Sequence, residues 1–169
     1  MLNQSIISSG AFTSMVIPKV TFSPQIPMGE VINSRFGEIM VDATRAVAFP
    51  NGLLGMPDKN HFVLANFSNE KMQQFNILQS LDDVNLAFIV LPLDLNNAII
   101  EIADIRGAAD DLLINYDDLL VLLVVSVHRS PSKVRMSVNA RAPLFIDVKR
   151  KFGTQYVFKD SAYKVQQML

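Results

Sequence analysis

Two apolar runs constrain the fold of this chain more than any other feature of its sequence. LAFIVLP occupies residues 86–92, and LLVLLVVSV occupies residues 119–127. Neither run alternates between apolar and polar side chains, so each predicts a strand buried on both faces, inside a closed or two-layered sheet. The longer run covers nine residues, whereas a membrane-spanning helix needs about 20. We therefore interpret it as a strand of the core.

The segments around these runs have the punctuation of an all-β protein. FPNGLLGMP, residues 49–57, excludes regular structure because prolines and glycines interrupt it. One short helical segment is expected within residues 96–118, and a turn at HRSPS is expected to end the longer apolar run. Short strands are predicted in VINSRFGEIMV, TRAVAF, HFVLANF, FNILQSL, KVRMSV, LFIDVK and TQYVF. Such short strands with short loops favour a small antiparallel β-barrel, or a sandwich, over a βαβ architecture.

Length and composition indicate one folded domain with an N-terminal extension. The chain has 169 residues and half of them are apolar, which suffices for one core. Residues 1–30 are rich in Ser, Thr and Pro and lack a long periodic pattern, so we expect a partly disordered extension. No cysteine occurs, and no basic region precedes the weak apolar stretch near the N-terminus. These features favour a cytoplasmic protein without a secretory signal.

Charge is distributed unevenly along the chain. Residues 1–128 carry 6 basic and 14 acidic side chains, whereas residues 129–169 carry 9 basic and 2 acidic ones. The basic residues of interest are Arg129, Lys133, Arg135, Arg141, Lys149, Arg150 and Lys151, and the aromatic residues among them are Phe145, Phe152, Tyr156 and Phe158. This mixture is typical of a platform for single-stranded nucleic acid, so a small RNA-binding barrel is an alternative. The other interpretation is that opposite charges mix on the folded surface.

The sequence offers little support for catalysis. Asp82 and Asp83 are adjacent carboxylates between two predicted strands, where a turn is a better interpretation than a catalytic pair. His61 and His128 have no metal-ligand spacing, and no cysteine could complete a zinc site. GxSxG, P-loop and GxGxxG motifs are absent from the sequence. We predict a protein that is not an enzyme and uses neither a cofactor nor a metal.

Three stretches in this order resemble the bacterial flagellar assembly factor family FliW. They are FGEIMVD followed by FPNGLLGMPDKNHFVL, then LQSLDDVNLAFIVLPL, and finally NARAPLFIDVKRKFGTQYVFKDSAYKV at residues 139–165. The resemblance covers residues 31–167, which we predict to form one FliW-like β-barrel domain. Two positions depart from the family pattern: Leu54 stands where a proline is usual, and Leu91 stands before Pro92 where an acidic residue is usual.

The resemblance implies a regulator that works by protein–protein interaction. Members of this family bind flagellin in the cytoplasm and, once flagellin is exported, bind CsrA, a dimeric mRNA-binding repressor of translation. Binding to CsrA relieves repression, so flagellin export is coupled to flagellin synthesis. A monomer that contacts neither a membrane nor, directly, a nucleic acid is expected.

Three groups of residues within the matching stretches are candidate partner contacts. The first is an apolar loop whose backbone is restricted by Pro and Gly: Phe49, Pro50, Asn51, Gly52, Leu53, Leu54 and Gly55. Exposed apolar loops often mark interfaces, but such a loop can equally plug the core. The second group is Gln79, Asp82, Asp83 and Asn85, and the third is Asn139, Arg141 and Pro143. Turn formation is an alternative explanation for the second group, and a bend for the third.

Overall fold

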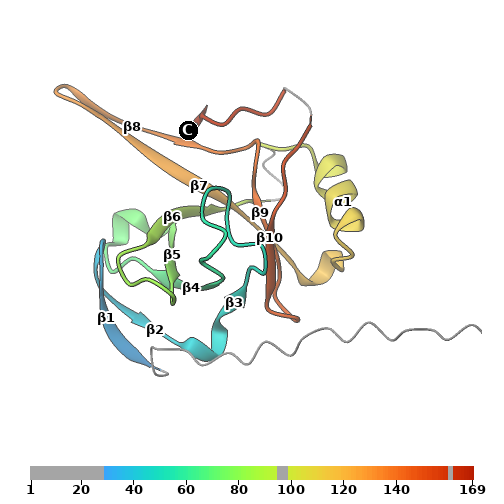
Figure 1. Ribbon diagram of the computed structural model, residues 1–169. Coiled ribbons are helices and arrows are strands. Elements are labelled where there is room, and N and C mark those ends of the chain that lie inside the picture. The colour runs from blue at the N-terminus through green and yellow to red at the C-terminus, as the bar shows by residue number, and fades with distance from the viewer. Residues whose placement is uncertain (1–28, 95–98, 160–161) are drawn as a thin grey trace, which may run out of the picture.

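The computed structural model describes residues 29–94, 99–159 and 162–169 (Figure 1). The predicted extension lies outside these ranges apart from its last two residues, and Glu30 already begins the first strand. The strands are β1 Glu30–Ser34, β2 Gly37–Val41, β3 Val47–Ala48, β4 His61–Asn66, β5 Asn76–Ser80, β6 Ala87–Pro92, β7 Leu119–Ser130, β8 Lys133–Val138, β9 Leu144–Asp147, β10 Phe152–Gln155 and β11 Gln167–Met168. One α-helix, α1, spans Ile102–Asp111, and short 3-10 helices occur at Ala43–Arg45, Glu70–Met72 and Tyr116–Asp118.

Seven strands pair in a closed ring. The order β7-β6-β5-β4-β3-β10-β9 is completed by a pairing of β9 with β7, in which Leu122 lies opposite Leu144. We call these seven strands the ring. The expectation of an all-β fold with one short helix is confirmed. One detail was wrong, because β10 runs parallel to β3, with Phe152 opposite Ala48, in a fold expected to be antiparallel.

Both apolar runs are buried on two faces, as their composition predicts. On β7, Leu122 points into the interior of the ring, while Val121 and Leu123 pack against the helix side. On β6, Val90 packs inside the ring and Leu91 packs on the outside. A strand between two apolar layers has no face available for polar side chains, which explains the missing alternation.

Strand β7 extends beyond the ring. Its residues Leu119–Leu122 pair with β9, and its residues Val125–Ser130 pair with β8 along the same edge. The segment Val125–Ser130 and β8 form a two-stranded hairpin that projects from the body (Figure 1), and we call it the arm. The turn expected at HRSPS occurs at its Pro131 and Ser132, and the strand continues past the apolar run to the pair of Ser130 and Lys133.

A bulge separates the ring from the arm. The five residues 139–143 lie opposite only two residues of β7, Leu123 and Val124, between the last pair of the arm and the first pair of the ring. The Asn139 N–H still donates to the Val124 carbonyl at 2.9 Å. Extra residues of this kind bend a strand and let its register restart, so the arm and the ring have independent registers on one strand.

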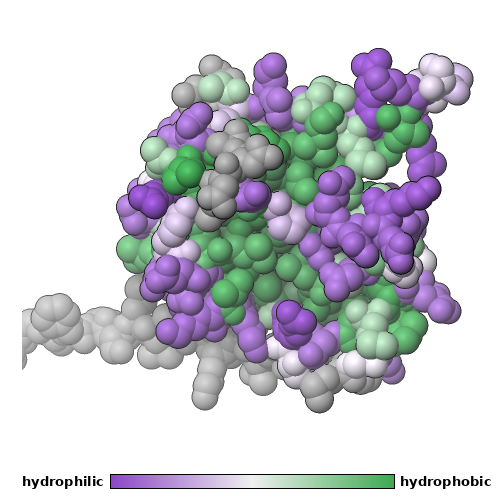
Figure 2. Space-filling view, turned by 180° about the vertical axis from the view of Figure 1, so that it is seen from behind, coloured by the Kyte–Doolittle hydropathy of each residue, from purple (hydrophilic) through white to green (hydrophobic). Residues whose placement is uncertain are grey.

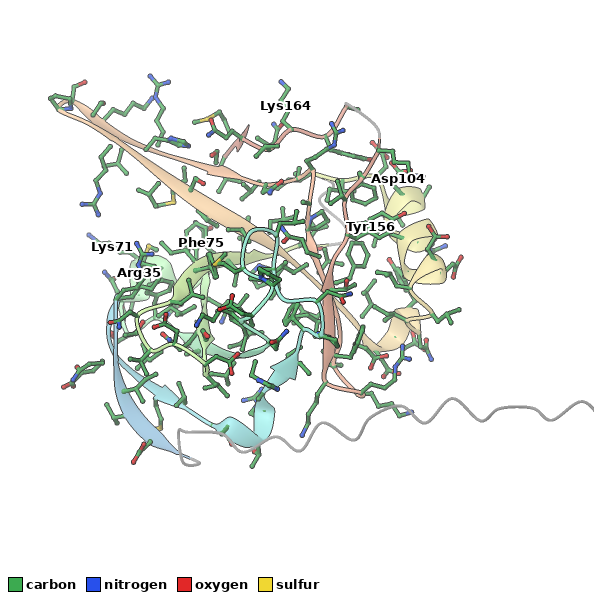
Figure 3. The ribbon with its side chains drawn as sticks, viewed as in Figure 1. Arg35, Lys71, Phe75, Asp104, Tyr156 and Lys164 are labelled. Carbon is green, nitrogen blue, oxygen red and sulfur yellow. The ribbon has the colours of Figure 1, made fainter. Side chains whose placement is uncertain are left out.

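Outer elements cover the ring on two sides. The hairpin of β1 and β2 packs Ile32, Ile39 and Val41 onto Val63 and Ile77. Helix α1 and the C-terminal segment form a second cover. Their contacts include a hydrogen bond from the Tyr156 hydroxyl to Asp111 at 2.9 Å and one from Tyr163 to Asp104 (Figure 3). The hydrogen bond to Asp111, together with burial, raises the pKa of Tyr156 above its usual value.

TRAVAF forms less strand than its β-branched residues predict. Asp42 accepts hydrogen bonds from the backbone N–H and the hydroxyl of Thr44 and caps a 3-10 turn, so only Val47–Ala48 is extended.

Seen from behind, the molecule shows apolar side chains over the middle of its surface and hydrophilic ones around them (Figure 2). Within the described ranges, no helix has both the length and the apolar character that crossing a membrane requires.

Two glycines give opposite predictions for the same substitution. A Cβ at Gly153 would lie 2.4 Å from the ring of the fully buried Phe49, so Gly153→Ala should lower the free energy of unfolding by about 2–3 kcal/mol. A Cβ at Gly107, in α1, would meet no atom within 4 Å, so Gly107→Ala should raise that free energy by about 0.5–1 kcal/mol. Urea unfolding of both variants measures the two changes, and a neutral Gly153→Ala would contradict the packing described here.

Candidate partner-binding face

The loop 49–55 is anchored by two of its apolar residues. The side chain of Phe49 is fully buried and makes an edge-to-face contact with Phe62, with ring centroids 5.5 Å apart. Leu53 is buried in the same cluster inside the ring. Gly52 has φ +62° and leaves no room for a Cβ, which would lie 2.2 Å from the Met56 carbonyl oxygen. Phe49 and Leu53 therefore plug the core, which is one of the two interpretations left open for this loop.

Leu54 is the apolar side chain that this loop presents to solvent. It is 61% exposed, and Pro50, Asn51 and Gly55 beside it are also exposed. The positive φ of Gly55, +84°, turns the chain back immediately after Leu54. The loop crosses in front of the ring in Figure 1. The buried side chains of Phe49 and Leu53 hold its backbone, from which Leu54 is exposed to solvent.

Asn60 connects this loop to the turn that follows β5. Its side-chain amide donates to the carbonyls of Phe49 and Pro50 at 2.9 and 3.2 Å. Its backbone N–H donates to Asp82 Oδ2 at 2.7 Å, and the N–H of His61 donates to the same oxygen at 2.8 Å. The start of β4 and the turn after β5 are thus held by one carboxylate.

The adjacent carboxylates are turn residues. Ser80 Oγ accepts from the N–H groups of Asp82 and Asp83 at 3.2 and 3.1 Å, and Asp83 Oδ1 accepts from the Asn85 N–H at 3.0 Å. Each oxygen serves a nearby backbone amide, as expected for Asp in turns. The turn interpretation is confirmed.

Asp82 has a perturbed acidity that follows from these contacts. Partial burial alone would raise the pKa of its carboxyl group. The backbone N–H and ring of His61, with the N–H of Asn60, outweigh burial and hold that pKa below its usual value. The ring Nδ1 of His61 lies 3.1 Å from Asp82 Oδ1. These contacts stabilise the ionised form of Asp82, which suits a structural acceptor.

Gln79 supports the turn from inside. It is fully buried, and its Nε2 donates to the carbonyls of Ser80 and Leu86 at 3.0 Å and of Val84 at 3.1 Å. A side chain without exposed surface cannot contact a partner unless the turn opens. The prediction that Gln79 is a direct contact is therefore wrong for this conformation, whereas Asp82 and Asn85 are exposed.

The third candidate group is the bulge between arm and ring. Asn139 Oδ1 accepts from the Ala142 N–H at 3.0 Å and closes the bend that its sequence predicts. Pro143 is buried, and Arg141 is half-buried with its guanidinium near the Lys159 carbonyl oxygen at 3.4 Å. Arg141 is therefore less exposed than expected, and Pro143 is not a surface contact.

Gln155 connects this bulge to the loop 49–55. Its Nε2 donates to the Ala142 carbonyl at 3.0 Å, and its Oε1 accepts from the Leu54 N–H at 2.9 Å. Gln155 and Asn60 therefore join all three candidate segments by hydrogen bonds. We call the exposed residues of the first two segments the partner face, to which the bulge contributes none: Pro50, Asn51, Leu54, Gly55, Asp82, Val84 and Asn85.

Sequence reasoning did not identify Asn60 or Gln155. Both lie within the stretches that resemble FliW, in KNHFVL and GTQYVF, but nothing local distinguishes them from other polar residues near strands. Their role depends on partners 10 to 101 positions away in the chain. The one feature of the sequence that could have identified them is a polar side chain at the junction of a predicted strand and an irregular loop.

The basic C-terminal third does not form the aromatic platform that the RNA-binding alternative requires. Phe145 and Phe158 are buried and Tyr156 is half-buried, whereas Phe152 is 37% exposed. Arg150 Nε contacts Asp147 Oδ2 at 2.6 Å, and Lys151 Nζ donates to the Thr44 carbonyl at 2.7 Å. The Arg150 N–H, against the opposing effect of burial, holds the pKa of the Asp147 carboxyl below its usual value.

The two histidines occupy ordinary structural positions. His61 contacts Asp82 as described above, and His128 Nε2 lies 2.7 Å from Ser137 Oγ on the arm. Among the residues that the structure describes, no three His, Asp or Glu side chains are placed to hold a metal ion.

Comparison with known proteins identifies the family. The family model described as FliW protein matches residues 30–169. The chain belongs to the FliW family. A flagellar assembly factor FliW from Bacillus pumilus is 28% identical over 149 residues, which cover 82% of this chain and 95% of that protein. The Geobacter sulfurreducens FliW is 31% identical over 133 residues, covering 79% and 81%.

A solved structure supports the same fold. The crystal structure of a flagellar assembly factor FliW matches with a TM-score of 0.61 and 20% identity, covering 82% of this chain and 96% of that one.

Replacing Asp82 by Asn tests its role in the turn. Asp82→Asn removes the negative charge that the two N–H groups and His61 stabilise, and should lower the free energy of unfolding at pH 7 by about 1 kcal/mol. The folded-state pKa is lowered, so this contribution is present above the unfolded pKa of about 4 and is lost as pH falls through the folded value. The difference between the two proteins should therefore shrink in acid, as urea unfolding from pH 7 to pH 3 would measure.

The matched control for this prediction is Asp83→Asn. Asn retains the side-chain oxygen that accepts from the Asn85 N–H and is equally common in turns, so little change is expected at any pH. An Asp82→Asn effect that is equal at every pH would contradict the electrostatic explanation.

Proposed function

We propose that this FliW-family chain is a non-enzymatic regulator of flagellar assembly. It works in the cytoplasm, binds flagellin and antagonises the translational repressor CsrA. Its two protein partners compete for it, so flagellin export releases the protein to act on CsrA and restores flagellin synthesis. The observation that carries the proposal is the match of residues 30–169 to the FliW family.

The geometry of the partner face supports binding as the function. Three segments far apart in the sequence are joined by Asn60 and Gln155 at one end of the ring. Loops held by a rigid strand scaffold are typical recognition elements, because little ordering is needed when a partner binds. The partner face combines the exposed apolar side chains of Leu54 and Val84 with polar Asn51, Asp82 and Asn85, a mixture found in binding patches.

The partner face lacks the features of an active site. The Asp82 carboxylate accepts from the N–H groups of Asn60 and His61, and Asp83 accepts from the Asn85 N–H in the turn. The His61 imidazole is engaged with Asp82. A catalytic acid or base needs access to a substrate in a cleft, with a pKa near the working pH. The lowered pKa of Asp82 moves its carboxyl group away from that range.

A competition experiment tests this proposal. We expect the purified full chain to form a discrete complex with flagellin and another with CsrA, both from the same organism, and each partner to displace the other. Leu54→Asp should weaken at least one complex about tenfold or more, because it replaces the most exposed apolar side chain of the partner face with a charge. Size-exclusion chromatography and fluorescence titration measure both effects.

Met40→Asp is the matched control. Met40 is 71% exposed on β2, outside the partner face, so its replacement should leave both complexes unchanged. Absence of both complexes at micromolar concentrations would refute the proposal. Equal effects of Leu54→Asp and Met40→Asp would refute the assignment of the partner face.

RNA binding by the basic C-terminal third gives a separate prediction. Phe145 and Phe158 are buried and cannot stack on bases, and of the four aromatic residues considered Phe152 alone is exposed, which does not make a platform. We expect no gel shift of single-stranded RNA even at low salt. A shift that weakens by orders of magnitude with rising salt would instead support the nucleic-acid alternative.

A further inference from the structure

The arm has a strand edge that is only half covered. On one edge β8 pairs with β7 along its whole length, and on the other it pairs with β11 at Val138 and Ser137. The final contact on that second edge is the Leu169 N–H to the Met136 carbonyl at 3.1 Å. In the described part of the chain, no strand pairs with Lys133–Arg135 on this edge.

The hydrogen-bond pattern shows which backbone groups face this open edge. The Asn139 N–H donates to Val124 of β7, and alternate residues of an antiparallel strand direct their N–H and C=O groups to opposite sides. Ser137 and Arg135 therefore bond towards β7, whereas Met136 and Val134 point away from it. The contact between Leu169 and Met136 confirms this parity. Val134 thus presents an N–H and a C=O to the open edge.

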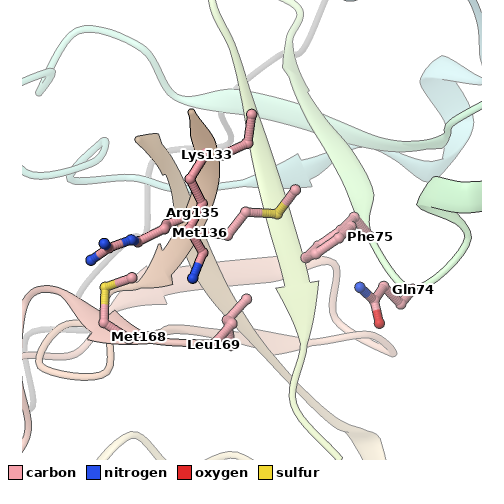
Figure 4. A pocket seen from close by; sticks show the side chains of 8 residues that line it. Gln74, Phe75, Lys133, Arg135, Met136, Met168 and Leu169 are labelled. Carbon is pink, nitrogen blue, oxygen red and sulfur yellow. The ribbon is translucent and has the colours of Figure 1, made fainter. Parts of the chain in front are cut away.

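A groove follows the open edge in line with β11. It has a volume of about 590 Å³ and is lined by Gln74, Phe75, Lys133, Val134, Arg135, Met136, Met168 and Leu169 (Figure 4). A second hollow of about 350 Å³ borders Lys133 and Arg135 together with His128, Arg129, Ser130, Gln166 and Met168. The two hollows flank the same edge, which leaves room for side chains on both faces of an added strand.

The two faces of the arm differ in chemistry. Because side chains alternate along a strand, Val134 and Met136 share one face, and Lys133 and Arg135 share the other. The first face includes the apolar groove against Phe75, where Val134 is 57% exposed, and Arg129 lies opposite Val134 on the same face. The second face is basic, and no ion pair with Lys133 or Arg135 occurs among the residues that the structure describes.

The chain itself offers no acidic segment for this surface. No acidic residue occurs between Leu119 and Ile146 or within residues 162–169, and none occurs in residues 1–28. A second copy of the chain placed edge to edge would bring Lys133 and Arg135 against the same cations, which is unfavourable. Charge therefore selects a different, acidic partner.

We propose that the open edge of β8 binds an extended acidic segment of a protein partner as an added strand. Apolar side chains of that segment face Val134, Met136 and Phe75, and its alternate acidic side chains face Lys133 and Arg135. Backbone bonds to Val134 supply affinity, and the two faces supply selectivity. This surface is separate from the partner face, so it adds to the proposed function without depending on it.

A synthetic peptide tests the proposal directly. The probe is a fluorescent octapeptide with blocked ends in which Glu and Val alternate, titrated onto the full chain at low salt. Binding should perturb the NMR amide signals of Val134 and Leu169, and should weaken as salt increases. A peptide in which Lys and Val alternate should not bind.

Two variants separate backbone pairing from charge. Val134→Pro removes the edge N–H without removing a bond to β7, so the melting temperature should hold while peptide affinity falls about tenfold or more. Lys133→Glu with Arg135→Glu should cause a loss of similar size. Lys149→Glu is the matched control, because Lys149 is an exposed lysine in the turn between β9 and β10, away from the arm, and its replacement should leave affinity unchanged.

The proposal fails on any of four results. These are absence of peptide binding, unchanged binding by a folded Val134→Pro protein, equal binding of the Lys–Val peptide, and concentration-dependent dimerisation that excludes the probe. Full displacement of the peptide by single-stranded RNA would overturn it in favour of a nucleic-acid edge. Failure of the flagellin and CsrA complexes leaves these measurements unaffected, so the two proposals are tested apart.

Discussion

The continuous strand β7, which pairs with both the ring and the arm, is the constraint on which the other features depend. Its first residues, Leu119–Leu122, close the ring against β9, and Leu122–Val124 pair with β6 on the opposite edge. Its last six residues carry the arm. Breaking β7 near Leu122 would open the ring and detach the arm together, because both ladders share this backbone. Exposing the apolar side chains at 119–125 to water would cost free energy, so hydrophobic burial holds β7 in place.

The loops depend on the ring through a few polar side chains. Phe49 fixes one end of the loop 49–55 inside the ring, and Gln155 of β10 holds the Leu54 amide. Asn60 then links the same loop to Asp82. Removing either linker leaves backbone groups of the loop without these side-chain partners. The shape of the partner face is therefore set by two side chains that lie beneath it, and its exposed residues inherit that shape.

Features that depend on residues close together in the sequence could be predicted, and features that depend on distant residues could not. The two strands buried on both faces were predicted correctly, because LAFIVLP and LLVLLVVSV are apolar at successive positions and so leave no polar face. The turn at Asp82 and Asp83 was predicted because its capping bonds span two or three residues. The closure of β7 on β9 and the contacts of Asn60 and Gln155 were not, because each joins segments distant in the chain. KVRMSV alternates as a strand should, yet Val134 stays exposed, since the pattern cannot tell that β8 leaves the body.

Because of the bulge at 139–143, the length of the arm can change without a change in the strand pairing of the ring. Pairings on its two sides are in separate registers, so residues inserted as matched pairs at the tip, between Ser130 and Lys133, would alter no contact of the ring. Each matched pair would carry the tip outward by about 3.4 Å. The distance between the tip of the arm and the ring can therefore change in small steps while the core of the ring stays constant.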